Sequence, residues 1–403
     1  MTPTSSPDCW PPPPTLNRGP KVSLKARLVP ALICTFLGLS WQLLTVHFNY
    51  HGNLTALFCT GVQLPIPPTL EREHIYRFPN SNGYDGQVYH YMAHDPLYRT
   101  EIGHAIGDPG FRYRRILLPA MSYALALGHQ QWIDRAYFFC NLFFLFLGSW
   151  WLATLLLGVG IHPGFAALYV LVPASLMSLD RMVVDLALTS LVLGFAVYAT
   201  AQSRWRRYLV LVLAALCRDT GFILAIASAV PPLIGRRFRT SLFWLSALLP
   251  ALAWYAFVRW HVGIGRYDPI EPLTALWESL LHPMHYPFAP AVTAGVHVLD
   301  GLMTLGQVIG IVLGLRRLKD AVLDPVRTTL VLWAVLGILL PRSVWSEFYG
   351  GARVLTPLLL LEFLRSFSER RPIDRLPLLL VCPRIWIQML PQVGGVLRGM
   401  LAG

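Results

Sequence analysis

The sequence predicts an all-α membrane protein in which about ten transmembrane helices, within a range of about nine to eleven, form one bundle. Of the 403 residues, 55% are hydrophobic and only 13% are charged, whereas soluble domains carry about 25% charged residues. Several apolar runs also approach the ~20 residues needed to cross a ~30 Å hydrocarbon core. We therefore expect a multi-pass protein of the inner (plasma) membrane.

The N-terminal residues 1–27 are rich in proline and then basic, which predicts a disordered cytoplasmic tail without a cleaved signal peptide. Lys21, Lys25 and Arg27 come directly before the first predicted span, residues 28–48. Because basic residues concentrate on the cytoplasmic side of spans, we predict a cytoplasmic N-terminus.

The polar, proline-interrupted region 49–115 is then predicted to be a long outer loop. The apolar segment 116–128 that follows is too short to cross the membrane comfortably. Two interpretations are open: the segment crosses, or it lies along the membrane as an interfacial helix. We favour the interfacial helix, because only then do the later basic clusters fall on the cytoplasmic side.

The remaining apolar runs predict nine further spans, at residues 136–157, 165–179, 182–201, 208–217, 221–234, 242–258, 292–315, 328–340 and 354–364. This order places four basic clusters in the cytoplasm, at residues 203–208, 235–239, 316–319 and 365–375. The runs 208–217 and 221–234 are short, so they either cross or form a buried re-entrant pair. The predicted bundle comprises residues 28–366, and residues 367–403 form a cytoplasmic or peripheral tail.

The net charge of +12 is explained by this topology, since basic loops orient spans and contact anionic lipids. We therefore expect membrane lipids as partners and no nucleic acid. The six cysteines are scattered and form no CxxC pair, which argues against a disulfide framework or a cysteine zinc site.

Ionisable residues collect at the predicted outer ends of the spans. They are Asp180, Arg181, Asp185, Arg218, Asp219, Arg342, Glu347 and Arg353, with Arg266, Asp268 and Glu271 in a later outer loop. Charges near hydrocarbon are costly unless they are paired or hydrated. We interpret the set as a hydrated polar site. The alternative is local ion pairing, Asp180 with Arg181 and Arg218 with Asp219.

The outer loop contains the segment GYDGQVYHYMAHDPLYR, residues 83–99. Asp85 is a plausible N-cap of a helix that ends before Pro96. Val88, Tyr91 and Met92 are expected to press one face of this helix into the membrane interface.

His90 and His94 are spaced i,i+4 and are followed by Asp95, a pattern that can bind a divalent metal. We favour packing and hydrogen bonding for these side chains, and we predict no metal and no other cofactor. A divalent metal is the alternative.

Three arginines, Arg112, Arg114 and Arg115, end the outer loop. Guanidinium groups bind phosphate through paired hydrogen bonds, so these residues can hold a lipid phosphate at headgroup depth. The alternative is that they extend to ordinary lipid headgroups.

Four motifs, YDGQVYHYMAHDP with YRRILLPAMSYAL, LDRMVVDLAL, CRDTGFILA and GGARVLTPLLL, resemble a group of bacterial membrane proteins related to the GT-C superfamily of glycosyltransferases. The resemblance implies a GT-C-like helical bundle with interfacial helices in the first outer loop. It also implies transfer of a sugar from a polyprenyl-phosphate donor to an envelope glycan, lipid or protein on the outer face. Asp85 would be the catalytic base and Asp95 a second acid.

The chemistry of this reaction fits the residues in the predicted outer site. A base must take the proton of the acceptor hydroxyl, and positive charge must hold the departing phosphate. The predicted substrate-binding residues are Tyr84, Gln87, Tyr91, Arg112, Arg115, Asp180, Arg181, Asp185, Arg218, Asp219, Glu347 and Arg353. Two other functions stay open, a transporter or flippase of a polar lipid or glycan and a non-catalytic membrane protein.

Overall fold

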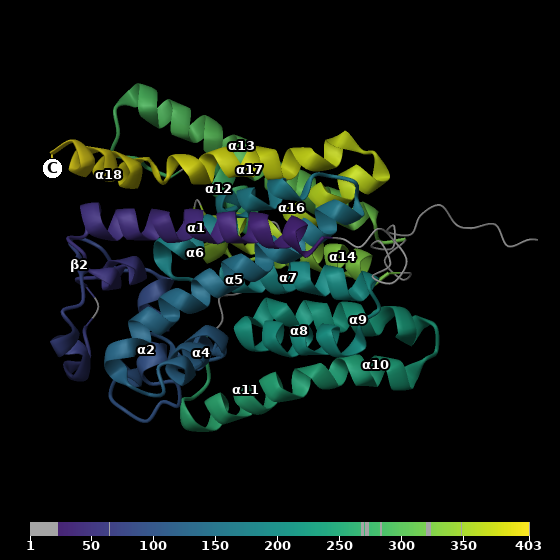
Figure 1. Cartoon of the computed structure of the whole chain (residues 1–403), viewed down its shortest axis with the longest axis horizontal. Helices are drawn as coiled ribbons and strands as arrows, with labels where there is room; N and C mark the ends of the chain where they lie inside the picture. Colours follow the sequence, from purple (N-terminus) through teal and green to yellow (C-terminus); the bar gives the residue numbers. More distant parts are fainter. Residues whose placement is uncertain are drawn as a thin grey trace, which may run out of the picture.

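The computed structural model of the chain is a helical bundle, as the sequence predicts (Figure 1). It describes residues 23–63, 65–266, 270, 274–282, 284–319, 324–347 and 349–402. In these parts of the chain the only sheet pairs two short parallel strands, β1 (Thr60–Gly61) and β2 (Arg77–Phe78). The predicted tail residues 1–22 and the outer-loop residues Asp268 and Glu271 lie outside the described residues.

Several helices are long and apolar enough to cross a membrane. Among the described residues there are four, α1 (Leu24–Asn49), α5 (Gln130–Gly158), the bent α10–α11 segment (Phe238–His261) and α13 (Pro290–Arg316). Two broken pairs raise this number to six, η4–α6 (Pro163–Leu171 and Pro173–Arg181, bent by 49°) and η8-α17 with α18 (Pro372–Ile387 and Leu390–Ala402, bent by 45°). Shorter apolar helices lie between them, α7 (Asp185–Thr200), the η5–α9 segment (Asp219–Ile234) and α14 (Pro325–Leu339).

The predicted short pair is a helical hairpin. Helix α8 (Arg204–Cys217) and helix α9 (Phe222–Ile234) are joined by the single turn η5 (Asp219–Gly221). The turn is tight, because a Cβ atom on Gly221 would lie 1.9 Å from the carbonyl oxygen of Ala214. Each helix is only about 20 Å long at 1.5 Å per residue, less than the ~30 Å of a hydrocarbon core.

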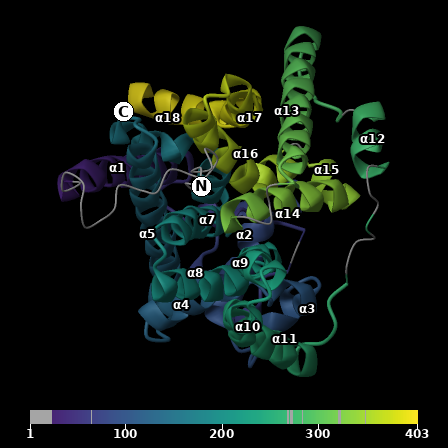
Figure 2. The same cartoon turned by 90° about the vertical axis from the view of Figure 1, so that its right-hand side faces the viewer.

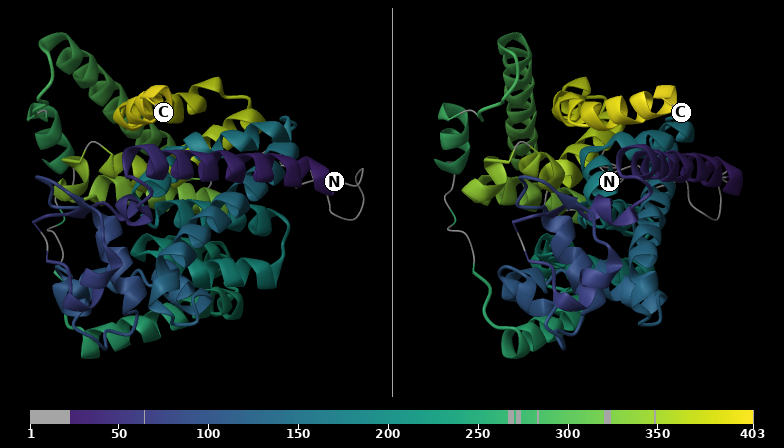
Figure 3. Two further views of the ribbon diagram at one scale, coloured as in Figure 1. Left: turned by 60° about the vertical axis from the view of Figure 1, so that its left-hand side comes forward. Right: turned by 90° about the vertical axis from the view of Figure 1, so that its left-hand side faces the viewer.

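The two ends of the bundle differ in what they carry (Figure 1). Helix α2 (Asp85–His94), strand β2 and helix α4 (Leu117–Leu125) lie together at one end. The connection between α9 and α10, which contains the basic cluster 235–239, lies at the opposite end. Helix α4 has nine residues, which is too few to cross a membrane. Helices α12 (Thr274–Leu281) and α13 stand out from the rest on one side (Figures 2 and 3).

Both chain ends depart from the predicted tails. Helix α1 begins at Leu24, so residues 24–27 belong to it. The C-terminal segment forms α17 (Leu376–Ile387) and α18 (Leu390–Ala402), and Gln392 accepts a hydrogen bond on its carbonyl oxygen from the Asn49 amide at 3.0 Å. Asn49 ends the first span at the predicted outer side. The C-terminal segment therefore contacts the end of α1 that the sequence predicts to be the outer end, whereas the sequence predicts a cytoplasmic or peripheral tail.

Candidate functional site

Helix α2 lies almost where the sequence predicts it, but its first residue is shifted by one position. It begins at Asp85 and ends at His94, two residues before Pro96. Tyr84 occupies the N-cap position, and the Asp85 side chain makes no capping hydrogen bond. The prediction of Asp85 as N-cap is therefore wrong by one residue, because this carboxylate bonds to arginines from other elements instead.

Gly86 lets the first turn of α2 pack directly against the end of α6. A Cβ atom at this position would lie 2.1 Å from the carbonyl oxygen of Arg181 and 2.8 Å from that of Phe58. These obstacles are backbone atoms, which cannot move aside as a side chain can. The glycine therefore places Asp85 beside the polar groups that α6 and its neighbours carry.

The predicted membrane-facing side of α2 is buried inside the protein. Tyr91 is 1% exposed and Met92 is fully buried, although both were expected to face the interface. The outer loop wraps this helix on several sides: Phe58 stacks on the His90 ring at 4.2 Å, and the Tyr91 hydroxyl donates to the Pro65 carbonyl. Enclosure by the loop, which the helical pattern alone does not reveal, replaces contact with lipid.

Asp85 lies between two arginines that are distant in sequence. Arg112 Nη1 is 2.5 Å from Asp85 Oδ1, and Arg353 Nη2 is 2.8 Å from Asp85 Oδ2. Burial by itself raises the pKa of Asp85, but Arg353 and Arg112 outweigh it and hold the pKa well below its usual range. The carboxylate is thus ionised and fully paired.

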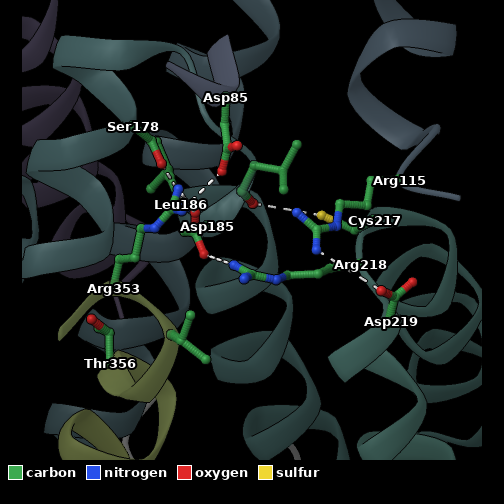
Figure 4. A network of polar contacts seen from close by, with 12 residues as sticks. Asp85, Arg115, Ser178, Asp185, Leu186, Cys217, Arg218, Asp219, Arg353 and Thr356 are labelled. Atoms are coloured by element: carbon green, nitrogen blue, oxygen red, sulfur yellow. Dashed lines mark hydrogen bonds and ion pairs between the residues drawn. The ribbon is translucent and has the colours of Figure 1, made fainter. Parts of the chain in front are cut away.

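A second carboxylate extends this pairing into the bundle (Figure 4). Asp185, at the start of α7, forms an ion pair with Arg218, and Arg353 Nη1 lies 3.4 Å from Asp185 Oδ2. Arg353 therefore bridges Asp85 and Asp185, and it comes from α16 (Gly350–Glu369), the helix that follows the predicted outer residue Glu347. We call Asp85, Arg112, Asp185, Arg218 and Arg353 the arginine cluster.

The two predicted local ion pairs have different outcomes. Asp180 and Arg181 do approach one another, at 3.5 Å. Arg218 bonds to Asp185, and Asp219 instead lies 3.9 Å from Arg115 and accepts a hydrogen bond from the Tyr255 hydroxyl at 2.7 Å. Residues adjacent in sequence point apart here because Arg218 is extended and Asp219 begins the next turn.

Aromatic rings and one acid border the arginine cluster on its outer side. The Arg181 guanidinium lies 5.1 Å from the ring centres of both Tyr84 and Tyr349. The Tyr84 hydroxyl donates to Glu347 at 3.3 Å. Burial raises the pKa of Glu347 although Arg353 opposes the shift, and burial also raises the pKa of Tyr84.

Ion pairs in this region match arginines with acids, and side-chain exposure increases from one member to the next. Five arginines face five acids, namely Arg112, Arg115, Arg181, Arg218 and Arg353 against Asp85, Asp180, Asp185, Asp219 and Glu347. Side-chain exposure rises from 9% at Arg353 to 27% at Arg112 and 43% at Glu347. Arg112 and Glu347 are thus the more exposed members of the group, and an anion that binds Arg112 or Arg353 must displace the Asp85 carboxylate.

Three predicted site residues on α2 do not join this cluster. Gln87 accepts from the Gly61 amide at 3.2 Å and donates to the Tyr91 hydroxyl at 3.2 Å, so both brace the outer loop. Asp95 accepts from the backbone amides of Arg99 and Thr100 at 2.8 and 2.9 Å. Each of these side chains is buried and makes its hydrogen bonds within the outer loop.

Tyrosines are the members of the site that sequence reasoning missed. Tyr89 accepts a hydrogen bond from Arg115, Tyr255 donates to Asp219, and Tyr349 stacks with Arg181. The sequence does offer one indication: Tyr89 follows Asp85 by four residues and therefore lies on the same face of α2.

The i,i+4 histidines meet acids other than the predicted Asp95. His90 and His94 on α2 lie with Glu73 and Asp134, and the four ligand atoms are all within 4.8 Å of one another. Glu73 ends the turn η2 (Pro68–Glu73), and Asp134 lies in the first turns of α5. We call this group the histidine cluster.

Comparison of the chain with protein-family models, with curated proteins and with solved structures gives no match. Its function is therefore inferred from its own residues and their arrangement.

Proposed function

We propose that this protein is a GT-C-like membrane glycosyltransferase with its site at the outer face of the inner membrane. It would transfer a sugar from a polyprenyl-phosphate donor to an envelope glycan, lipid or protein. The bundle would have about ten or eleven spans with a cytoplasmic N-terminus. The observation that carries the proposal is the position of Asp85, a partly open carboxylate held between Arg112 and Arg353.

The reaction assigns one role to each kind of group. The acceptor oxygen forms a bond to the anomeric carbon, and the bond from that carbon to the phosphate oxygen breaks. Asp85 takes the proton of the acceptor hydroxyl as general base. Arg112 and Arg353 bind the leaving polyprenyl phosphate, and such charge stabilisation is worth several kcal/mol in a site that excludes water.

Pairing with two arginines makes Asp85 a weak base in the ligand-free protein, because it lowers the pKa of this carboxyl. A donor phosphate competes for the same guanidinium groups and binds them through charge-assisted hydrogen bonds. When the phosphate binds one of the two guanidinium groups, Asp85 loses one of its ion pairs, so its pKa rises and it becomes a stronger base. Donor binding would thus activate the base only when the substrate is in place.

The position of the cluster suits a donor that is anchored in the membrane. Asp85 starts α2, which lies with the short apolar helix α4 at one end of the bundle (Figure 1). A polyprenyl chain in the hydrocarbon would present its phosphate at headgroup depth, where arginines readily reside.

The test is sugar transfer by membranes that contain the Asp85→Asn variant. The substrates are radiolabelled polyprenyl-phosphate hexoses and pentoses, offered as a panel, with label followed into lipid, glycan and protein fractions. We expect a loss of at least 100-fold in transfer, the usual contribution of a general base.

Asp374→Asn is a matched control, because Asp374 is also a buried acid paired with arginine, Arg317 at 2.9 Å. It follows the far end of α16, away from Arg353. Full transfer by a well-expressed Asp85→Asn variant would disprove the role of base. Binding of donor by wild-type protein without any transfer would favour the flippase alternative.

A further inference from the structure

A second site lies at the other end of α2, in the histidine cluster. His90 and His94 are buried, whereas the side chains of Glu73 and Asp134 are 21% and 17% exposed. Three separate elements supply these groups, the turn η2, the helix α2 and the helix α5. The site is therefore a junction between the outer loop and a long helix, and it opens at the carboxylate side.

Hydrogen bonds fix how the His94 ring is protonated. Its Nδ1 atom lies 2.6 Å from the side-chain oxygen of Gln130, and the Gln130 amide nitrogen donates to the His94 carbonyl at 3.2 Å. Since the Gln130 oxygen can only accept, His94 Nδ1 must carry a proton. In the neutral ring Nε2 then has a free lone pair.

That lone pair faces negative charge. His94 Nε2 is 3.3 Å from Asp134 Oδ1 and 3.4 Å from Glu73 Oε2. Two kinds of cation can satisfy this arrangement: a proton on Nε2, which gives a hydrogen bond to Asp134, or a metal ion that Nε2 and both carboxylates share. The fixed Nδ1 proton and the free Nε2 atom are the arrangement that orients a metal-binding histidine.

His90 adds a second nitrogen without a hydrogen-bond partner. Its Nε2 atom is 2.7 Å from Asp134 Oδ1, but not in the direction of a hydrogen bond, so neither ring nitrogen has such a partner. The ring is held in place by stacking on Phe58. A buried imidazole nitrogen in close contact with a carboxylate, but without hydrogen-bond geometry, fits two ligands of one shared ion.

We propose that Glu73, His90, His94 and Asp134 bind one divalent transition-metal ion, with Zn²⁺ the best fit. Two neutral imidazoles and two carboxylates balance the charge of such an ion. Nitrogen and oxygen ligands at 2.0–2.2 Å from tetrahedral zinc lie roughly 3.4 Å apart, close to the separations around His94. Within the described residues, Glu73 and Asp134 form no ion pair with lysine or arginine that would compete with the ion.

The ion would fasten the outer loop to the bundle. It would join η2 and the end of α2 to α5, and so hold the helix whose first residue is Asp85. This role is structural and does not depend on the proposed glycosyltransferase activity.

The test uses full-length protein in detergent, purified without a histidine tag. The protein is stripped with chelator, reloaded with Zn²⁺, Mn²⁺ or Co²⁺, and analysed for bound metal and for the melting temperature. We expect about one metal per chain and a rise in Tm of several degrees on loading. Bound Co²⁺ should show the visible absorption of a tetrahedral site.

His94→Gln and Glu73→Gln should lower metal affinity at least tenfold. The second variant changes a partly exposed position, so it tests the site even if replacement of the buried His94 disturbs folding. His104→Ala, an exposed histidine of the same loop, is the matched control and should bind as wild type does. The proposal is overturned if wild-type protein binds none of the three ions, or if both Gln variants bind them as well as His104→Ala does.

Discussion

The two ends of helix α2 neutralise carboxylates in opposite ways. At its start, Asp85 is paired with the guanidinium groups of Arg112 and Arg353. At its end, Glu73 and Asp134 face the imidazoles of His90 and His94. Guanidinium is always charged and has no lone pair, whereas imidazole can be neutral and bind a metal.

This difference shows how one short helix can serve two kinds of ligand. Arginines at one end can exchange their carboxylate for an anion such as a phosphate. Histidines at the other end leave the carboxylates free to share a cation. Along the axis of α2, Asp85 lies about 14 Å from His94 and about 8 Å from His90, so we expect the two ends to act largely independently.

The largest effect is expected from removing the acid of the arginine cluster. Asp85→Ala removes the acid that pairs with Arg112 and one of the acids that pair with Arg353, which keeps Asp185. We expect a loss of about 3 kcal/mol, the lower end of the range for removing one partner of a buried pair, because Arg112 is partly exposed. Thermal unfolding in detergent with and without chelator measures the change. The Tm should fall, and the decrease in Tm that chelator causes should be as large as in the wild-type protein. Loss of this chelator-dependent decrease in Tm would show that the two ends of α2 are coupled.

A smaller effect is expected from Gly86→Ala, since the new Cβ atom would meet the Arg181 and Phe58 carbonyls. Overpacking of this kind costs about 1–3 kcal/mol. Displacement of the first turn of α2 should reduce sugar transfer while metal content stays at the wild-type level. Gly107→Ala is a suitable control, because a Cβ atom there meets nothing within 4 Å. Equal transfer by both variants would contradict the close packing at Gly86.

Independence of the two ends can be measured with a double variant. Changes in stability at positions more than about 7–10 Å apart usually add within about 0.5 kcal/mol. The loss for Asp85→Asn with His94→Gln should therefore equal the sum of the single losses, measured by chemical unfolding in detergent. An interaction energy above about 1 kcal/mol would mean that α2 transmits strain between its ends.

The smallest effect is expected from Glu347→Gln. The pKa of Glu347 is raised in the folded protein, so its ionised form is less favourable there than in the unfolded chain. Its contribution to stability therefore falls as the pH rises through the unfolded value of about 4.3. At pH 7 the Gln variant should melt slightly higher than wild type, by about 1–2 °C, and at pH 4 the difference should shrink. A lower Tm at pH 7 would mean that pairing with Arg353 outweighs burial.

Composition and the order of the basic clusters were sufficient to predict the helical membrane class. The length of an apolar run and the charges beside it are local properties, so they can be found without knowing the tertiary structure. The apolar runs predicted α13 closely and α1 to within about one helical turn, whereas α5 begins at Gln130, earlier than the predicted residue 136; Pro96 predicted the end of α2. They did not predict the path of the C-terminus, because short proline-broken apolar helices are stabilised by packing, such as that of Gln392 on Asn49. Local pattern carries little information about such contacts.

For the site, local sequence patterns identify residues with suitable chemistry, whereas the packing of the helices sets which partners they meet. Asp185, Arg218 and Arg353 were predicted from their positions at span ends, and Asp85 and Arg112 from the motifs of the outer loop, yet the pairing of Arg218 with Asp185 rather than Asp219 was not predicted. Likewise the i,i+4 histidines were visible, but Glu73 and Asp134 come from other elements. Helical spacing fixes neighbours within four residues, whereas ion pairs and metal ligands depend on how separate helices are packed side by side.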